Sequence, residues 1–94
     1  MRYADCIIKN NVLIRYEGNG GRVVIPEGVT GIKQKAFWYS KVSEVVFPES
    51  LIRIEDQAFY KCSELQAARL PKSVTELGYG VFGTCYSLRE VTIP

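Results

Sequence analysis

Two stretches decide the fold: residues 42–62, VSEVVFPESLIRIEDQAFYKC, and residues 65–85, LQAARLPKSVTELGYGVFGTC. Each stretch has a short apolar run before a proline, two branched apolar residues after it, and a phenylalanine near its end. The prolines recur along the chain at intervals of 22, 23 and 23 residues, at Pro26, Pro48, Pro71 and Pro94. A constant period in this range is typical of a solenoid, in which one unit is stacked several times.

The run before each proline is predicted to be a β-strand. Its apolar residues alternate with others, as in Val45-x-Phe47, so one face points inward and one outward. Proline has no backbone N–H to donate to a sheet, and it stands where it would end each strand. The segment from Ile32 to Phe37 is too short for an independent helix. We therefore expect it to form one helical or 3₁₀ turn that carries Phe37 into the core.

This repeat resembles the BspA-like leucine-rich repeats of bacterial and protist surface proteins. The resemblance rests on the pattern LxxVxIPxSVTxIxxxAFxxC, which both stretches above follow. It covers residues 20–94, as three near-complete repeats that end on a fourth strand, with Gly20 in the first leucine position. It implies an α/β fold. The expected architecture is a right-handed leucine-rich-repeat solenoid with a parallel β-sheet on the concave face and short helical or 3₁₀ turns on the convex side.

Residues 1–94 are predicted to form a single domain, of which residues 1–19 do not fit the repeat. Two apolar runs in this segment flank Asn10-Asn11, and asparagine tolerates the positive φ angles of a tight turn. We expect residues 1–19 to form a β-hairpin that caps the first rung, because a solenoid needs covered ends.

The last strand, which ends at Ile93-Pro94, has no following segment to cover it. An uncovered apolar rung favours association with other chains. Two alternatives follow. Either the chain is a fragment of a longer array, or this edge pairs with another molecule.

The side chains that point outward from the predicted strands form the candidate binding face. In leucine-rich repeats the parallel sheet lines the concave surface and its outward side chains contact partners, so the resemblance implies a binding role for eight residues. They are Arg22, Val24, Glu44, Val46, Ala67, Arg69, Glu90 and Thr92. The alternative is a solvated face on which charges pair between rungs. It is favoured for any single residue, because few interface residues carry binding energy.

Aromatic residues gather near the phenylalanine turns, at Trp38, Tyr39, Tyr60, Tyr79 and Tyr86. Aromatic clusters on a surface mark contacts with proteins or sugars. Trp38 and Tyr39 are therefore the secondary contact site that we would test first. The regular placement of these rings favours the alternative that they pack between rungs.

Cys62 and Cys85 occupy the same position of adjacent repeats. They lie within disulfide reach if the rungs stack, but the favoured alternative is two buried free thiols that act as small apolar residues. Cys6 has no partner by sequence. Three cysteines without histidine or C-x-x-C spacing make a poor zinc site, so we expect neither a metal nor a cofactor.

Composition narrows the classes of function. The chain has no histidine, which removes the commonest general base, and we expect no enzyme activity. The net charge is +2 and the basic residues are dispersed, so a nucleic-acid partner is not expected. No apolar run approaches the roughly 20 residues that cross a bilayer, and the N-terminus has no signal-peptide pattern, so membrane insertion is not expected either.

These observations favour a non-enzymatic protein-interaction or adhesion module. Its partner would be a host protein, a second copy of the chain or a glycan, and the resemblance implies a bacterial surface or secreted protein. The alternative is a structural segment that caps or assembles a longer array and self-associates through its open C-terminal rung. A third class, a domain attached to an enzyme, is supported by no feature of this sequence.

Overall fold

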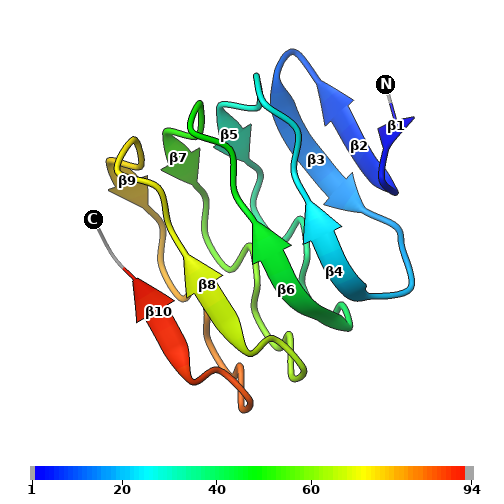
Figure 1. Ribbon diagram of the computed structural model, residues 1–94, viewed down its shortest axis with the longest axis vertical. Helices are drawn as coiled ribbons and strands as arrows, with labels where there is room; N and C mark the ends of the chain where they lie inside the picture. Colours follow the sequence, from blue (N-terminus) through cyan, green and yellow to red (C-terminus); the bar gives the residue numbers. More distant parts are fainter. Residues whose placement is uncertain (1, 93–94) are drawn as a thin grey trace.

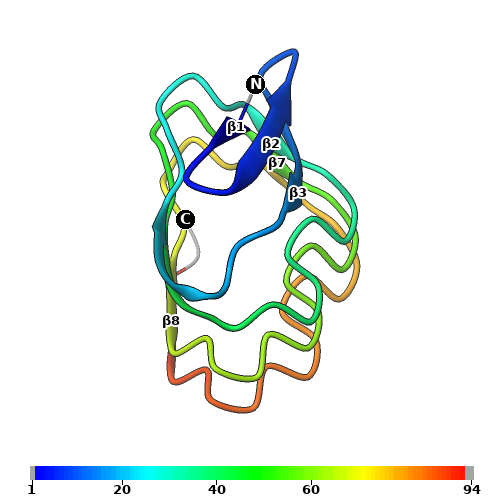
Figure 2. The same cartoon turned by 90° about the vertical axis from the view of Figure 1, so that its right-hand side faces the viewer.

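The computed structural model describes residues 2–92, which form a stack of rungs (Figures 1 and 2). Ile93 and Pro94, the predicted end of the fourth strand, lie outside the described residues. The strands are β1 (Arg2–Tyr3), β2 (Cys6–Lys9), β3 (Val12–Tyr16), β4 (Gly21–Val24), β5 (Gly31–Ile32), β6 (Val42–Val46), β7 (Arg53–Ile54), β8 (Ala67–Arg69), β9 (Glu76–Leu77) and β10 (Glu90–Thr92).

The strands that precede the prolines form one parallel sheet, as predicted. Their order is β10-β8-β6-β4. Val23 pairs with Val45, which in turn pairs with Ala68, and all three side chains point inward and are buried. After β4, β6 and β8 the proline begins a tight turn, in which its carbonyl accepts a hydrogen bond from the N–H three residues later.

The prediction of helical or 3₁₀ turns, and with it the α/β class, was wrong for residues 2–92, which contain no helix. The fold is a β-solenoid with two sheets. The short strands β5, β7 and β9 stack in parallel and continue the N-terminal strands, in the order β1-β2-β3-β5-β7-β9. A strand of two residues is too short to show an alternating pattern, so the sequence could not indicate this second sheet.

Left-handed backbone explains why the segment after each short strand is not helical. The φ angle is +61° at both Lys35 and Tyr39, and the next rung repeats this conformation at the equivalent positions. A right-handed helix cannot run through such residues. Alternate N–H groups donate instead to the next rung, as from Phe37 to the carbonyl of Ala58 at 2.7 Å. The turns are thus bonded along the stack much as the strands are.

The predicted N-terminal hairpin is present. Strands β2 and β3 pair antiparallel around Asn10 and Asn11, whose φ angles are +52° and +64°. Strand β3 pairs in parallel with β5, so the hairpin extends the second sheet (Figure 1). Cys6, Ile8 and Leu13 belong to the buried core. That this hairpin acts as a cap remains a prediction.

A stack of aromatic rings runs through the core from rung to rung. Phe37 lies 4.6 Å from Phe59, which lies 5.6 Å from Phe82, measured between ring centroids. Tyr16, in the hairpin, continues the stack at 5.0 Å from Phe37. Because Tyr16 holds the phenylalanine position of an earlier rung, the repeat geometry begins inside the segment that the sequence pattern excluded.

Cys62 and Cys85 form no disulfide, in agreement with the favoured alternative of free thiols, although Cys62 is buried and Cys85 is only half-buried. Each of the two equivalent thiols donates to the phenylalanine carbonyl of the preceding rung: Cys62 to Phe37 at 3.0 Å and Cys85 to Phe59 at 3.1 Å. Burial raises the pKa of Cys62 to about 11. The thiol is therefore protonated at neutral pH and acts as a small hydrogen-bonding core residue.

Candidate binding face

The outer face of the four-stranded sheet carries all eight side chains of the predicted binding face. Strand register sets them in two rows along the stack, between rows of inward residues. One row consists of Arg22, Glu44, Ala67 and Glu90, and the other of Val24, Val46, Arg69 and Thr92. A role for these residues in binding remains a prediction.

Arginines and glutamates alternate across this face. Arg22 Nε lies 3.3 Å from Glu44 Oε1. Arg69 reaches both neighbouring carboxylates, with Nη2 at 2.7 Å from Glu90 Oε1 and Nη1 at 4.0 Å from Glu44 Oε2. These side chains are 41–61% exposed, so each pair contributes at most about 1 kcal/mol to stability. The charges are thus held in place but stay accessible to a partner.

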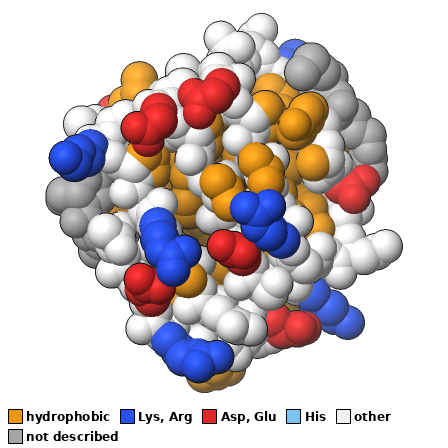
Figure 3. Space-filling model, in the orientation of Figure 1, with side chains coloured by type: hydrophobic (Ala, Val, Ile, Leu, Met, Phe, Trp, Pro, Cys, Tyr) orange, Lys and Arg blue, Asp and Glu red, His pale blue; other side chains and the backbone are white. Residues whose placement is uncertain are grey.

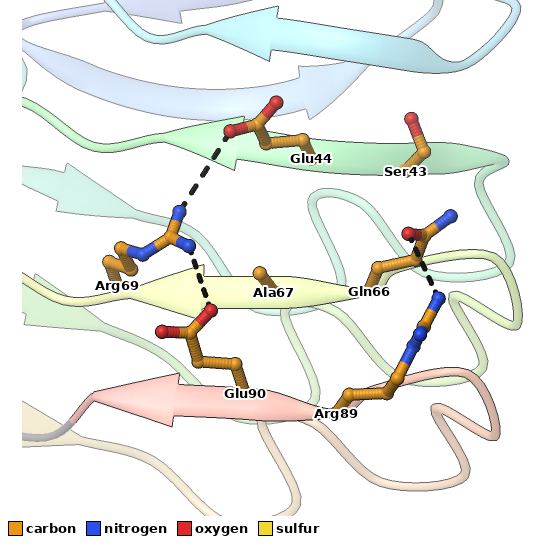
Figure 4. Close-up of a pocket in the computed structure, with 7 residues that line it drawn as sticks. All are labelled: Ser43, Glu44, Gln66, Ala67, Arg69, Arg89 and Glu90. Carbon is orange, nitrogen blue, oxygen red and sulfur yellow. Dashed lines mark hydrogen bonds and ion pairs between the residues drawn. The ribbon is translucent and has the colours of Figure 1, made fainter.

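A hollow of about 440 Å³ lies in the middle of this charged row (Figure 4). The small side chain of Ala67 leaves space between the two flanking glutamates. The sequence did not predict the opposite wall of this hollow. That wall is formed by the residues that directly precede the outward row of charged side chains: Ser43, Gln66 and Arg89. Their shared position one residue before the outward row was the available signal.

An apolar area adjoins the charges at the β4–β6 end of the sheet. Val24 is 40% exposed and lies beside Val46 in the strand register. Apolar side chains lie next to charged ones on this face of the molecule (Figure 3). An apolar centre beside polar groups is the usual composition of a protein-binding surface.

Trp38 and Tyr39, the predicted secondary site, lie on the turns and contact each other edge to face at 4.7 Å. Tyr60 approaches both rings at 6.4–6.5 Å. The alternative that the aromatic residues pack between rungs was wrong for Tyr79 and Tyr86, which are 79% and 83% exposed. One repeat of 23 residues earlier, the equivalent positions hold Asp56 and Ser63, which have no aromatic ring.

Lysines lie over these rings. Lys35 Nζ is 4.5 Å from the centre of the Trp38 ring, and Lys61 Nζ is 5.3 Å from that of Tyr39. The hydroxyl of Tyr39 is the main reason that the pKa of Lys61 is raised above its ordinary value. The ammonium groups are therefore positioned by their aromatic neighbours as well as by the backbone.

The described part of the chain shows no group of three or more carboxylate, thiol or imidazole side chains that could hold a metal ion. Within the same residues, no helix is long and apolar enough to span a bilayer.

Comparison with known proteins found matches to a family model and to solved structures. The family model described as "BspA type Leucine rich repeat region (6 copies)" matches residues 15–94. The crystal structure of a leucine rich cell surface protein from Faecalibacterium prausnitzii A2-165 matches with a TM-score of 0.68 and 31% identity. That match covers 74% of this chain but only 18% of the Faecalibacterium protein.

The Leucine Rich Repeat protein of T. pallidum gives a TM-score of 0.40 at 19% identity, over 86% of this chain and 73% of that one. No curated protein matches the sequence. The family match spans most of the chain and begins one residue before Tyr16, where the aromatic stack begins. The chain belongs to the BspA-type leucine-rich repeat family.

Proposed function

We propose that this chain is a non-enzymatic protein-interaction module that binds through the outer face of its four-stranded sheet. The observation that carries the proposal is the row of alternating charges beside an exposed apolar area. Apolar contacts at Val24 and Val46 would supply affinity, while Arg22, Glu44 and Arg69 would fix the register of the partner.

The backbone makes this face suitable for recognition. Parallel strands hold neighbouring outward side chains about 4.8 Å apart, and both sheets and the turns bond each rung to the next. Little order has to be gained on binding, which reduces the entropic cost. The likeness to a leucine rich cell surface protein supports a place at the bacterial surface. We extend the proposal to a secreted form and to a role in adhesion.

The test begins with the immobilised chain and a panel of purified extracellular proteins. Every partner found is then measured against Arg69→Ala and Glu90→Ala, and we expect binding at least 10-fold weaker. Arg15→Ala is the matched control, because Arg15 also pairs with a glutamate, Glu17, at 2.8 Å, but on the hairpin. Unchanged affinity of both sheet variants for every partner contradicts the proposal.

A second candidate is an array segment that self-associates through its last rung. Leu77 and Val91 are 43% and 40% exposed, whereas Ile54 and Ala68, at the same positions one rung earlier, are 1% and 0% exposed. A covering rung from another chain would bury them. Light scattering should then show a concentration-dependent dimer that Leu77→Lys abolishes, and a monomer at all concentrations would count against this candidate.

A further inference from the structure

A second surface lies on the turns, away from the sheet face. We call it the aromatic–lysine flank and define it by Lys35, Trp38, Tyr39, Tyr60 and Lys61. Trp38 and Tyr39 are 43% and 55% exposed, although both are large and largely apolar. Exposed aromatic rings that contact one another and carry cations above them are typical of binding surfaces.

The backbone of this flank has no free donor for a ligand. Within residues 35–40, the odd-numbered N–H groups donate to carbonyls of the next rung, and the even-numbered ones donate to the carbonyl three residues earlier. A peptide therefore cannot add to the flank as an extra strand, which requires unpaired backbone groups. Recognition here must use side chains.

The charge of the flank is positive and uncompensated. Within residues 2–92, Lys35 and Lys61 of the flank form no ion pair with a carboxylate, and neither does the nearby Lys41. Arg22 and Arg69 of the sheet face, by contrast, both form ion pairs with glutamates. An anionic ligand would gain more from the lysines, because no intramolecular carboxylate has to be displaced.

A polar hollow adjoins the rings. It measures about 380 Å³ and is lined by Gly18, Asn19, Tyr39, Ser40 and Lys41. This volume falls in the range of roughly 300–1,000 Å³ that is usual for small-molecule sites. Tyr39 belongs to both the hollow and the aromatic–lysine flank. One ligand could thus contact aromatic rings, an amide, a hydroxyl and ammonium groups together.

We propose that the aromatic–lysine flank and this hollow form a binding site for an acidic saccharide, a chain of pyranose rings that bears carboxylate or sulfate groups. The C–H face of a pyranose matches an aromatic ring, its hydroxyls match Asn19 and Ser40, and its acidic group matches Lys41 or Lys61. Nucleic acid fits less well, because its affinity grows with the number of phosphates neutralised and only a few lysines stand here.

Trp38, the only tryptophan of the chain, makes the site directly observable. The probes are hexagalacturonate and a sulfated heparin-type hexasaccharide. Controls of similar size are neutral maltohexaose, hexaglutamate and an eight-residue oligothymidylate. We expect saturable changes in tryptophan fluorescence with one or both acidic saccharides and much smaller ones with the controls. Binding should weaken with added salt.

Substitutions distinguish binding at this site from non-specific binding elsewhere on the surface. Tyr39→Ala and Lys61→Gln should each weaken saccharide binding at least 10-fold, while Tyr3→Ala and Lys72→Ala, an exposed aromatic residue and an exposed lysine elsewhere, should not. Thermal unfolding monitored by circular dichroism checks the fold. If Tyr39→Ala fails to fold, Lys41→Gln and Lys61→Gln carry the test.

Several outcomes overturn the proposal. If maltohexaose binds as tightly as the acidic saccharides, the acidic group is not recognised. If hexaglutamate binds as tightly, the sugar ring is not recognised. Tighter binding of the oligothymidylate assigns the site to nucleic acid. Unchanged fluorescence with every probe, or equal loss of binding in the Tyr3 and Lys72 variants, contradicts a site at this position. None of these results depends on whether the sheet face binds a protein.

Discussion

At the scale of single residues, close approach between rungs decides which side chains are allowed. Gly20 occupies a position that holds leucine in the repeat pattern, with φ at +104°. A Cβ atom there would collide with the backbone carbonyl of Lys41. The departure from the pattern is therefore required by the packing of the linker against the next rung.

The neighbouring glycine provides a matched control for this effect. Gly21 also has a positive φ, +80°, but a Cβ there would meet nothing within 4 Å. We expect Gly21→Ala to lower the free energy of unfolding by about 1 kcal/mol through backbone strain alone. Gly20→Ala should cost about 3 kcal/mol, because overpacking adds to the strain. Urea denaturation measures both, and equal losses would contradict the collision.

Cys62 predicts a dependence of stability on pH. Its pKa is about 11 in the folded chain, against an ordinary value of 9.0. The unfolded thiol therefore ionises first, so the contribution of this group is fully present below pH 9 and is lost as the pH rises towards 11.

We expect the difference in free energy of unfolding between wild type and Cys62→Ser to fall across this window. Serine keeps a hydrogen-bond donor but does not titrate there, and all other ionising groups are common to both chains. Chemical denaturation at several pH values gives the difference. A constant value from pH 8 to pH 11 would show that the thiol is not desolvated.

At the scale of elements, the aromatic stack links each rung to the next. Phe59 is fully buried and contacts Phe37, Phe47 and Phe82. We expect Phe59→Ala to lower the free energy of unfolding by about 3–5 kcal/mol, through lost burial and the cavity that remains. Phe82→Ala should cost less, because Phe82 is only partly buried. Denaturant titration tests this order, and a larger loss at Phe82 would contradict it.

The elements also show how far the sequence could lead. Spacing alone placed Phe37, Phe59 and Phe82 in one stacked core position, and the outward strand residues on one face. It failed at Lys35 and Tyr39, because left-handed backbone at residues other than glycine leaves no compositional signal. The helical expectation followed from that failure. Of the candidate binding face, the wall formed by Ser43, Gln66 and Arg89 was missed, since hollows depend on relative side-chain size.

At the scale of the whole molecule, stability should vary along the stack, because each rung contacts only its neighbours. Two equivalent amides report this. The N–H of Ile25 donates to Val46, and that of Leu70 donates to Thr92 in β10, the last described strand. Both residues are buried.

We expect the Leu70 amide to exchange with solvent at least 10-fold faster than the Ile25 amide in the isolated chain. The acceptor strand of Leu70, β10, has a neighbouring strand on one side only, whereas the acceptor strand of Ile25, β6, has one on each side. Hydrogen exchange followed by NMR at low protein concentration measures both rates. Equal rates would mean that the stack opens only as a unit, and strong concentration dependence would indicate association at this end.

The direction of the hydrogen bonds between rungs has a mechanical consequence. Strands β1 and β10 lie at opposite ends of the stack, and the bonds that join the rungs run along it (Figure 1). A force that pulls the two ends apart acts along these hydrogen bonds. The bonds of one rung boundary therefore break before those of the next, and the boundaries do not all break at once. Each rung that opens would release roughly 75 Å of chain. Such a module would extend under tension one rung at a time, and this stepwise extension would limit the force between the groups attached to its two ends.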